Sequence, residues 1–140
     1  MIMASFIFNS CLDDMARGAI DFDTDTFKVM LVTSTYVADK DTHLKRSAVT
    51  NEVTGTGYTA GGSTTACTVA KDTATDKVTL SFATVSWATA TITARAAVIY
   101  KSRGGASSAD ELVCYIDFNG NVSAAGSTFT LGASTITLQN

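Results

Sequence analysis

Residues 20–34 read Ile-Asp-Phe-Asp-Thr-Asp-Thr-Phe-Lys-Val-Met-Leu-Val-Thr-Ser. An acidic turn therefore leads directly into an almost continuous apolar segment, residues 27–33. A short apolar run of this kind, rich in β-branched and aromatic residues, predicts a strand that is buried on both faces. The stretch contains no residue pattern typical of catalysis.

The composition around this strand also favours β structure. Threonine is abundant, serine and glycine are plentiful, proline is absent, and helix-favouring Leu, Glu and Lys are scarce. At 140 residues the chain is long enough to bury its own core without disulfides. The predicted fold is mainly β: one domain over residues 1–140, an antiparallel β-sandwich or partly closed barrel with a short N-terminal helix. Further strands are expected at residues 67–70, 78–82, 92–101, 112–118, 128–131 and 135–138.

One helix is expected near the N-terminus. Asn9 or Ser10 would cap it, and Gly18 suits its C-terminal stop. Its apolar face would hold residues spaced three and four apart, namely Leu12, Met15 and Ala16.

Two hairpins are expected among the strands. Residues 67–70 and 78–82 would form the first, with Val78, Leu80 and Phe82 facing the core. Residues 128–131 and 135–138 would form the second, around Gly132-Ala133-Ser134.

The strand at residues 92–101 is expected to follow a bend that contains Trp87. Its side chains should alternate between two faces, because successive residues of a strand point to opposite sides of the sheet. One face would hold Ala94, Ala96 and Val98, and the other Arg95, Ala97 and Ile99.

Charge and cysteine content argue against several classes of protein. A net charge of −3 with scattered basic residues does not favour nucleic-acid binding, and the densest basic spot, Lys45-Arg46, is interpreted as two solvated loop charges. Cys11, Cys67 and Cys114 are too few and too widely spaced for a disulfide framework or a zinc site, so they should pack as small hydrophobic residues. No secretory or membrane-spanning segment is recognised, and synthesis and assembly in a cytoplasm are expected.

No catalytic, cofactor-binding or metal-binding residues are predicted. Asp21, Asp23 and Asp25 have the alternate spacing of calcium loops, but the glycine and glutamate of an EF-hand are missing. An acidic turn is favoured, while a looser calcium site shared with Asp39 or Asp41 stays open. The single histidine, His43, lies in a hydrophilic loop without a nucleophile motif, and the two glutamates, Glu52 and Glu111, have no glycosidase spacing.

Two loops are the predicted contact surfaces. Residues 55–62 read Gly-Thr-Gly-Tyr-Thr-Ala-Gly-Gly and lack the ending of a phosphate-binding loop, whereas residues 102–110 are rich in Gly, Ser and Ala. Small residues allow close approach of another backbone. The predicted interface residues are Tyr58, Gly61, Gly62, Arg103, Gly104 and Gly105, with Tyr58 serving either as an interface anchor or as a half-buried core residue. Trp87 is expected in the core, with a sugar-stacking platform as the alternative.

Three motifs taken in order carry a resemblance to a known family. They are residues 20–34, the segment Asn-Glu-Val-Thr-Gly-Thr-Gly-Tyr-Thr-Ala-Gly-Gly at residues 51–62, and Thr-Ile-Thr-Ala-Arg-Ala-Ala-Val-Ile-Tyr at residues 91–100. The chain resembles a family of small virion structural proteins of tailed bacteriophages, from Phe8 to Phe118. The resemblance implies a virion component, and no catalytic residue is carried over from it.

Three functions follow as expectations. The first is a capsid decoration protein that forms a symmetric homo-oligomer and binds the phage major capsid protein of the assembled head. The second places the chain in the neck, collar or tail, against another virion protein. The third is a glycan-binding module on the virion surface, with Trp87 or Tyr58 as stacking residues. No cofactor, nucleic acid or membrane is expected as a partner.

Overall fold

The computed structural model describes residues 5–140. Its elements are β1 (Phe6–Ile7), α1 (Asn9–Ala16), β2 (Phe27–Val32), a short 3₁₀ helix (Arg46–Ala48), β3 (Ser63–Thr65), β4 (Cys67–Asp72), β5 (Lys77–Phe82), β6 (Val85–Lys101), β7 (Leu112–Leu131) and β8 (Ser134–Gln139).

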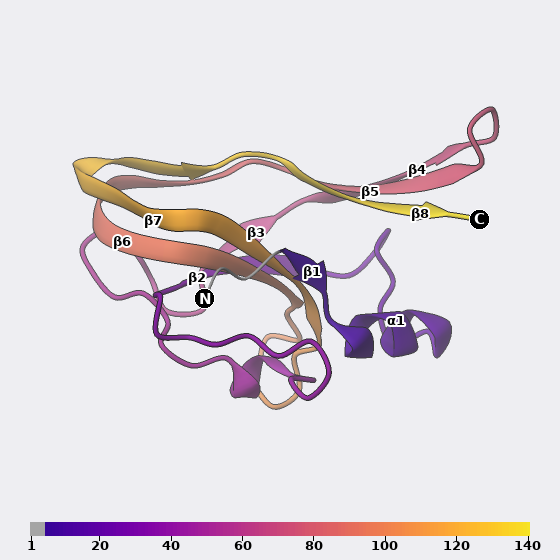
Figure 1. Cartoon of the computed structure of the whole chain (residues 1–140), viewed down its shortest axis with the longest axis horizontal. Helices are drawn as coiled ribbons and strands as arrows, with labels where there is room; N and C mark the ends of the chain where they lie inside the picture. Colours follow the sequence, from indigo (N-terminus) through magenta and orange to yellow (C-terminus); the bar gives the residue numbers. More distant parts are fainter. Residues whose placement is uncertain (1–4) are drawn as a thin grey trace.

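The strands form two antiparallel sheets. The larger sheet has the order β1-β7-β6-β2-β3, and the smaller has the order β4-β5-β8. The two sheets lie one above the other with α1 at one side (Figure 1). Both sheets are open within the described residues, so the sandwich-like prediction is confirmed and the barrel alternative is not needed.

β2 is buried on both faces, as its apolar sequence predicts. Phe27, Val29 and Leu31 pack into the core between the two sheets, together with Leu80 and Phe82 of β5. The intervening side chains, Met30 and Val32, belong to a second cluster on the opposite face of the larger sheet. That second cluster is covered by the N-terminal segment and by residues 33–49, which contribute Phe8, Tyr36, Ala38 and Val49.

β6 and β7 are much longer than expected. β6 begins at Val85, so Trp87 lies within a strand rather than at a bend, and β7 continues past Phe118 to Leu131. Their pairing changes register at several points, and Thr89 and Asn119 adopt positive φ at 51° and 58°. Such bulges absorb extra residues without ending a strand. Polar residues that suggest turns therefore mark bulges here.

One of these irregularities changes which side chains share a face. Ala94 pairs with Val122, whereas Ala96 pairs with Asp117, so β7 contains three extra residues opposite this point. Ala94 lies in the core between the sheets with Ala97, and Ala96 lies in the second cluster. The prediction that Ala94 and Ala96 share one face is wrong, because strict alternation does not hold across a bulge.

The first hairpin is confirmed and the terminal hairpin is wrong. β4 and β5 pair antiparallel from Cys67–Phe82 to Asp72–Lys77. β8, however, pairs with β5, from Phe82–Ser134 to Lys77–Gln139, while the end of β7 pairs with β6. The segment between β7 and β8 thus connects two sheets instead of turning within one.

α1 differs from its prediction in its cap and in its buried face. Asn9 is the first helical residue and Phe8 is the N-cap, without a side-chain cap hydrogen bond. Cys11 is the fully buried residue of the helix, and Leu12 is 50% exposed. Cys11 and Met15 lie four residues apart on one face against the core. Gly18 adopts φ of +71° just beyond the helix, as expected for a C-terminal stop.

The smaller sheet extends past the larger sheet, on the side of α1, as an arm (Figure 1). Its far end carries the turn between β4 and β5 and the C-terminus (Figure 1). Along β5 the inward residues pass from Phe82 and Leu80, both buried, to Val78, which is half-buried. The burial of the inner face therefore decreases toward the tip of the arm.

Candidate functional site

The glycine-rich loop is held by hydrogen bonds to its own chain. The Tyr58 hydroxyl accepts a hydrogen bond from the Leu31 amide at 2.9 Å and donates one to Oε1 of Glu52 at 2.7 Å. The same carboxylate oxygen accepts from the Gly61 amide at 2.6 Å. Burial raises the pKa of Tyr58 well above its ordinary value. Tyr58 is therefore a half-buried core tyrosine, the second of its two predicted roles.

The glycines of this loop lie against the neighbouring strands of the same chain. A Cβ at Gly62 would stand 1.7 Å from the carbonyl oxygen of Val29 in β2, and a Cβ at Gly55 would stand 2.3 Å from that of Thr91 in β6. Both have positive φ. The close backbone approach predicted for this loop is thus made within the molecule, and only glycine permits it.

The loop at residues 102–110 is anchored at its base and open at its tip. The Arg103 guanidinium binds the buried Glu111 carboxylate, with Nη2 2.6 Å from Oε1. The Arg103 amide donates to Asp110 Oδ1 at 2.8 Å. A Cβ added at Gly104 or Gly105 would meet no atom within 4 Å. The tip therefore presents exposed backbone on a fixed base.

Lys45 and Arg46 take part in this anchoring, which corrects their interpretation as solvated charges. Arg46 Nε lies 2.7 Å from Oδ2 of Asp110, whose side chain is almost fully buried, and Lys45 Nζ lies 3.3 Å from Glu111 Oε1. The spacing of these residues along the chain gives no sign of their pairing.

Tyr100 connects the two predicted loops. The Arg46 guanidinium lies 5.0 Å from the centre of the Tyr100 ring, and the Tyr100 hydroxyl donates to the Gly61 carbonyl at 2.5 Å. A continuous path of contacts thus runs from Gly61 through Tyr100 and Arg46 to Asp110. The only local sign of this path in the sequence is the acidic pair Asp110-Glu111, directly before β7.

The ion pairs at Glu111 predict a loss of stability in acid. Burial alone would raise the pKa of Glu111, but hydrogen bonds from Arg103 and Lys45 outweigh it and hold the pKa below its ordinary value. A carboxyl whose folded pKa is lowered stabilises the fold above its unfolded pKa, and this stabilisation is lost as pH falls through the folded value. We expect Glu111→Gln to lower the urea midpoint at neutral pH and to reduce its fall between neutral pH and about pH 3. Asp76→Asn, in the exposed β4–β5 turn, is the control. If the urea midpoint of Glu111→Gln falls in acid as much as that of the wild type, the ion pairs of Glu111 do not cause the acid sensitivity.

Two of the three carboxylates of the acidic turn, those of Asp21 and Asp25, accept hydrogen bonds within the turn. The Asp23 amide donates to Asp21 Oδ1 at 2.9 Å, and the Asp21 amide donates to Asp25 Oδ2 at 2.7 Å. Asp25 also pairs with Lys101 at 2.8 Å. Asp39, the proposed helper, instead accepts from the Asp41 amide of its own loop. Residues 5–140 contain no group of three or more His, Cys, Asp or Glu side chains able to hold a metal ion.

We therefore expect metal removal to leave stability unchanged. Thermal unfolding midpoints measured with a chelator and with added calcium should coincide, because the carboxylates of Asp21 and Asp25 already accept hydrogen bonds within the turn. A rise of several degrees on adding calcium would contradict this, and Asp21→Asn would then identify the turn as the site.

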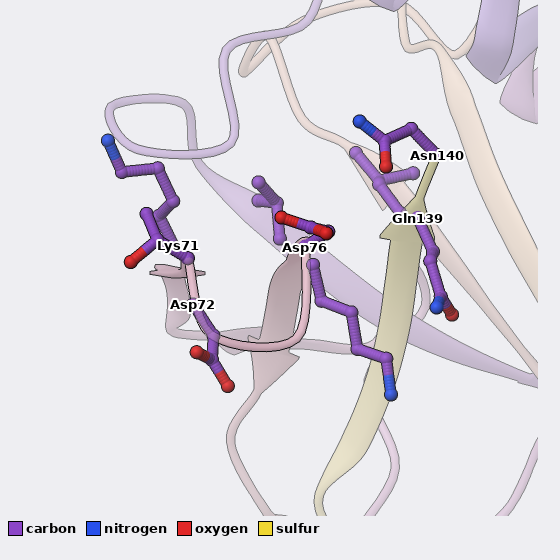
Figure 2. A pocket seen from close by; sticks show the side chains of 9 residues that line it. Lys71, Asp72, Asp76, Gln139 and Asn140 are labelled. Carbon is purple, nitrogen blue, oxygen red and sulfur yellow. The ribbon is translucent and has the colours of Figure 1, made fainter.

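The hollow at the arm tip does not assemble a reaction centre. It measures about 400 Å³ and has an apolar floor that includes Val78 and Leu138. Figure 2 shows Lys71 and Asp72 on one side and Gln139 and Asn140 on the other, with Asp76 at the turn between them. These polar side chains do not converge on a common point, so the hollow is a surface depression at the end of the sheet.

The histidine, two of the cysteines and the tryptophan contribute to the packing of the fold. The His43 imidazole shares a hydrogen bond of 2.8 Å with the Tyr36 hydroxyl. Cys11 and Cys114 are buried and unpaired, and burial raises the pKa of each thiol to about 12. Trp87 is only 4% exposed, so the core prediction is confirmed and its ring offers no platform for a sugar.

Comparisons with protein-family models, curated proteins and solved structures found no match to this chain. Among the helices of the described residues, none has the length and apolar character needed to cross a membrane.

Proposed function

We propose that the protein is a non-enzymatic structural component of a tailed-phage virion, a decoration protein that binds the major capsid protein of the assembled head. Its three sequence motifs resemble such virion proteins. The observation that carries the proposal is the exposed loop tip at Gly104 and Gly105, held on a base of ion pairs to the buried carboxylates of Asp110 and Glu111. A firmly held backbone surface suits repeated docking on a lattice, because little conformational entropy is lost on binding.

Three acidic side chains that could in principle act in catalysis instead hold loops in place, which supports a structural role for the protein. Glu52, Asp110 and Glu111 each hold a loop through hydrogen bonds or ion pairs. Contacts through Gly104 and Gly105 would use backbone groups rather than charges. Such contacts depend only weakly on ionic strength.

Capsid binding tests the proposal. We expect the purified protein to co-sediment with mature, undecorated capsids at both low and high ionic strength. Gly105→Trp should weaken this binding, since the indole would block close backbone approach. Gly132→Trp is the matched control, because a Cβ at that glycine also meets no atom within 4 Å and neither position needs positive φ.

Failure to bind mature capsids at either ionic strength would overturn the decoration role. A neck, collar or tail position would then be tested by the copy number in purified particles, measured relative to the major capsid protein. Equal loss of binding in both tryptophan variants would instead show that the loop tip is not the contact surface.

A further inference from the structure

β8 forms an unpaired edge of the smaller sheet. Among the described residues its backbone pairs only with β5, in an unbroken register from Ser134 to Gln139. Half of the amide and carbonyl groups along an edge strand point away from the sheet and can bond to another strand. Natural edges are often protected by charges, proline, bulges or very short strands. β8 has six residues, Ser-Thr-Ile-Thr-Leu-Gln, and none of these protections.

The other sheet edges are less suited to pairing. β4 has the same length, but its outer end carries Lys71 and Asp72. β3 has three residues and β1 has two. Among these four outermost strands of the described residues, β8 is the longest without a charged side chain.

The side chains of β8 match a second copy of themselves in one antiparallel register. A two-fold axis at Thr137 would place Thr137 opposite its own copy and Ile136 opposite Leu138. On the other face, Thr135 would lie opposite Gln139, since strand residues alternate between faces. Apolar residues then meet apolar ones and hydroxyls meet polar groups. No charged side chain lies opposite another, which matters for a chain with net charge −3.

Space beside β8 can receive an apolar side chain of the partner. A hollow of about 270 Å³ lies between β8 and β1, the edge strand of the larger sheet. Its lining is largely apolar and includes Ile7, Phe82, Cys114 and Ile116 together with residues 134–137. Leu138 of a second copy would project toward this hollow, because it would lie opposite Ile136 on the inner face of the sheet.

The arm shape favours the antiparallel arrangement. The β4–β5 turn and the end of β8 project past the larger sheet (Figure 1). In an antiparallel pair centred on Thr137, the tip of each arm lies beside the base of the other. The two bodies then stand toward opposite ends of the shared sheet.

We propose that two copies of this chain associate through antiparallel pairing of their β8 strands, which joins the two smaller sheets into one continuous sheet. The pairing deepens the proposed function, since it supplies the symmetric oligomer expected of a decoration protein. It is tested on the free protein without capsids, so its failure and the failure of capsid binding are distinguishable.

Sedimentation equilibrium provides the first test. We expect wild-type protein to reach a mass of about 29 kDa, twice that of the 14.6 kDa chain, as its concentration rises. Thr137→Lys should raise the dimer dissociation constant at least about fivefold at low salt, since it sets two like charges opposite each other. Thr68→Lys on β4 is the matched control, because Thr68 and Thr137 are both exposed strand residues on edge strands. Dissociation by Thr68→Lys instead would assign the interface to β4 and overturn the proposal.

Disulfide trapping tests the register. In a Cys67→Ser background, Thr137→Cys should form a covalent dimer under mild oxidation, because the two-fold axis brings that residue against its own copy. Thr135→Cys should not, since its partner is Gln139 and its own copy lies four residues away along the strand. Equal cross-linking of both variants, or a monomer at all concentrations, would overturn the proposal. Loss of the dimer on deletion of residues 1–4 would assign the contact to the N-terminus rather than to β8.

Discussion

Gly62→Ala is expected to lower the free energy of unfolding by about 3–5 kcal/mol. The added methyl group would lie 1.7 Å from the Val29 carbonyl oxygen and 2.6 Å from its carbonyl carbon. Both are backbone atoms of β2, the strand buried on both faces, and they cannot rotate away. Gly62 also has φ of +76°, where any other residue is strained.

Gly104→Ala separates the two causes of this loss. Gly104 has φ of +77°, almost the same as Gly62, but no atom lies within 4 Å of its added Cβ. Its substitution should therefore cost only the backbone strain, about 1–2 kcal/mol. Urea denaturation of the two variants and the wild type measures both values. Equal losses would show that the contact between Gly62 and β2 does not constrain the fold.

Trp87→Ala is expected to lower the free energy of unfolding by about 3–5 kcal/mol through the cavity it leaves. The indole packs between two aromatic rings, with centroids 5.8 Å from Tyr58 and 6.0 Å from Phe129. Its Nε1 has no hydrogen-bond partner among the described residues, so the loss should come from packing rather than from a broken hydrogen bond. Leu12→Ala, at a side chain that is half exposed, is the control and should change stability little.

Fluorescence gives an independent measurement of the same residue. The chain contains a single tryptophan, so its emission reports on Trp87 alone. We expect a blue-shifted maximum and weak quenching by iodide. A water-like maximum that iodide quenches readily would show an exposed ring, and it would restore Trp87 as a candidate for stacking on a sugar.

The parts of the fold predicted correctly depend on local patterns. The apolar run at residues 27–33 has no polar face, so its strand had to be covered on both sides. The β4–β5 hairpin joins neighbours in sequence, and the alternation of Val78, Leu80 and Phe82 identifies its inner face. Each of these features follows from residues a few positions apart.

The predicted strand boundaries are wrong at residue types that are common both in turns and in bulges. Asn119 and Gly126 suggest turns, yet both lie within β7 at positive φ. A bulge and a turn use the same residue types, since both need unusual backbone angles. Only pairing with β6 along most of its length shows that the strand continues.

The two loops predicted as contact surfaces differ in how their glycines are placed. Glycine and other small residues mark both loops, and Gly104 and Gly105 are exposed. Gly61 and Gly62, in contrast, pack against Tyr100 and β2 of the same chain. Glycine permits close approach of a backbone, but its presence does not say whether that backbone is internal or belongs to a partner.

Short-range periodicity and conformational preference in the sequence are enough to predict a mainly β chain, a central strand buried on both faces, the first hairpin and two loops rich in small residues. The pairing of β8 with β5, and the ion pair between Arg46 and Asp110, 64 residues away, become apparent only in the tertiary structure. The alternation of side chains along a strand shows which face is buried, but it does not specify the strand with which it pairs. An ion pair between distant residues likewise exists only once the sheets have set their backbones side by side.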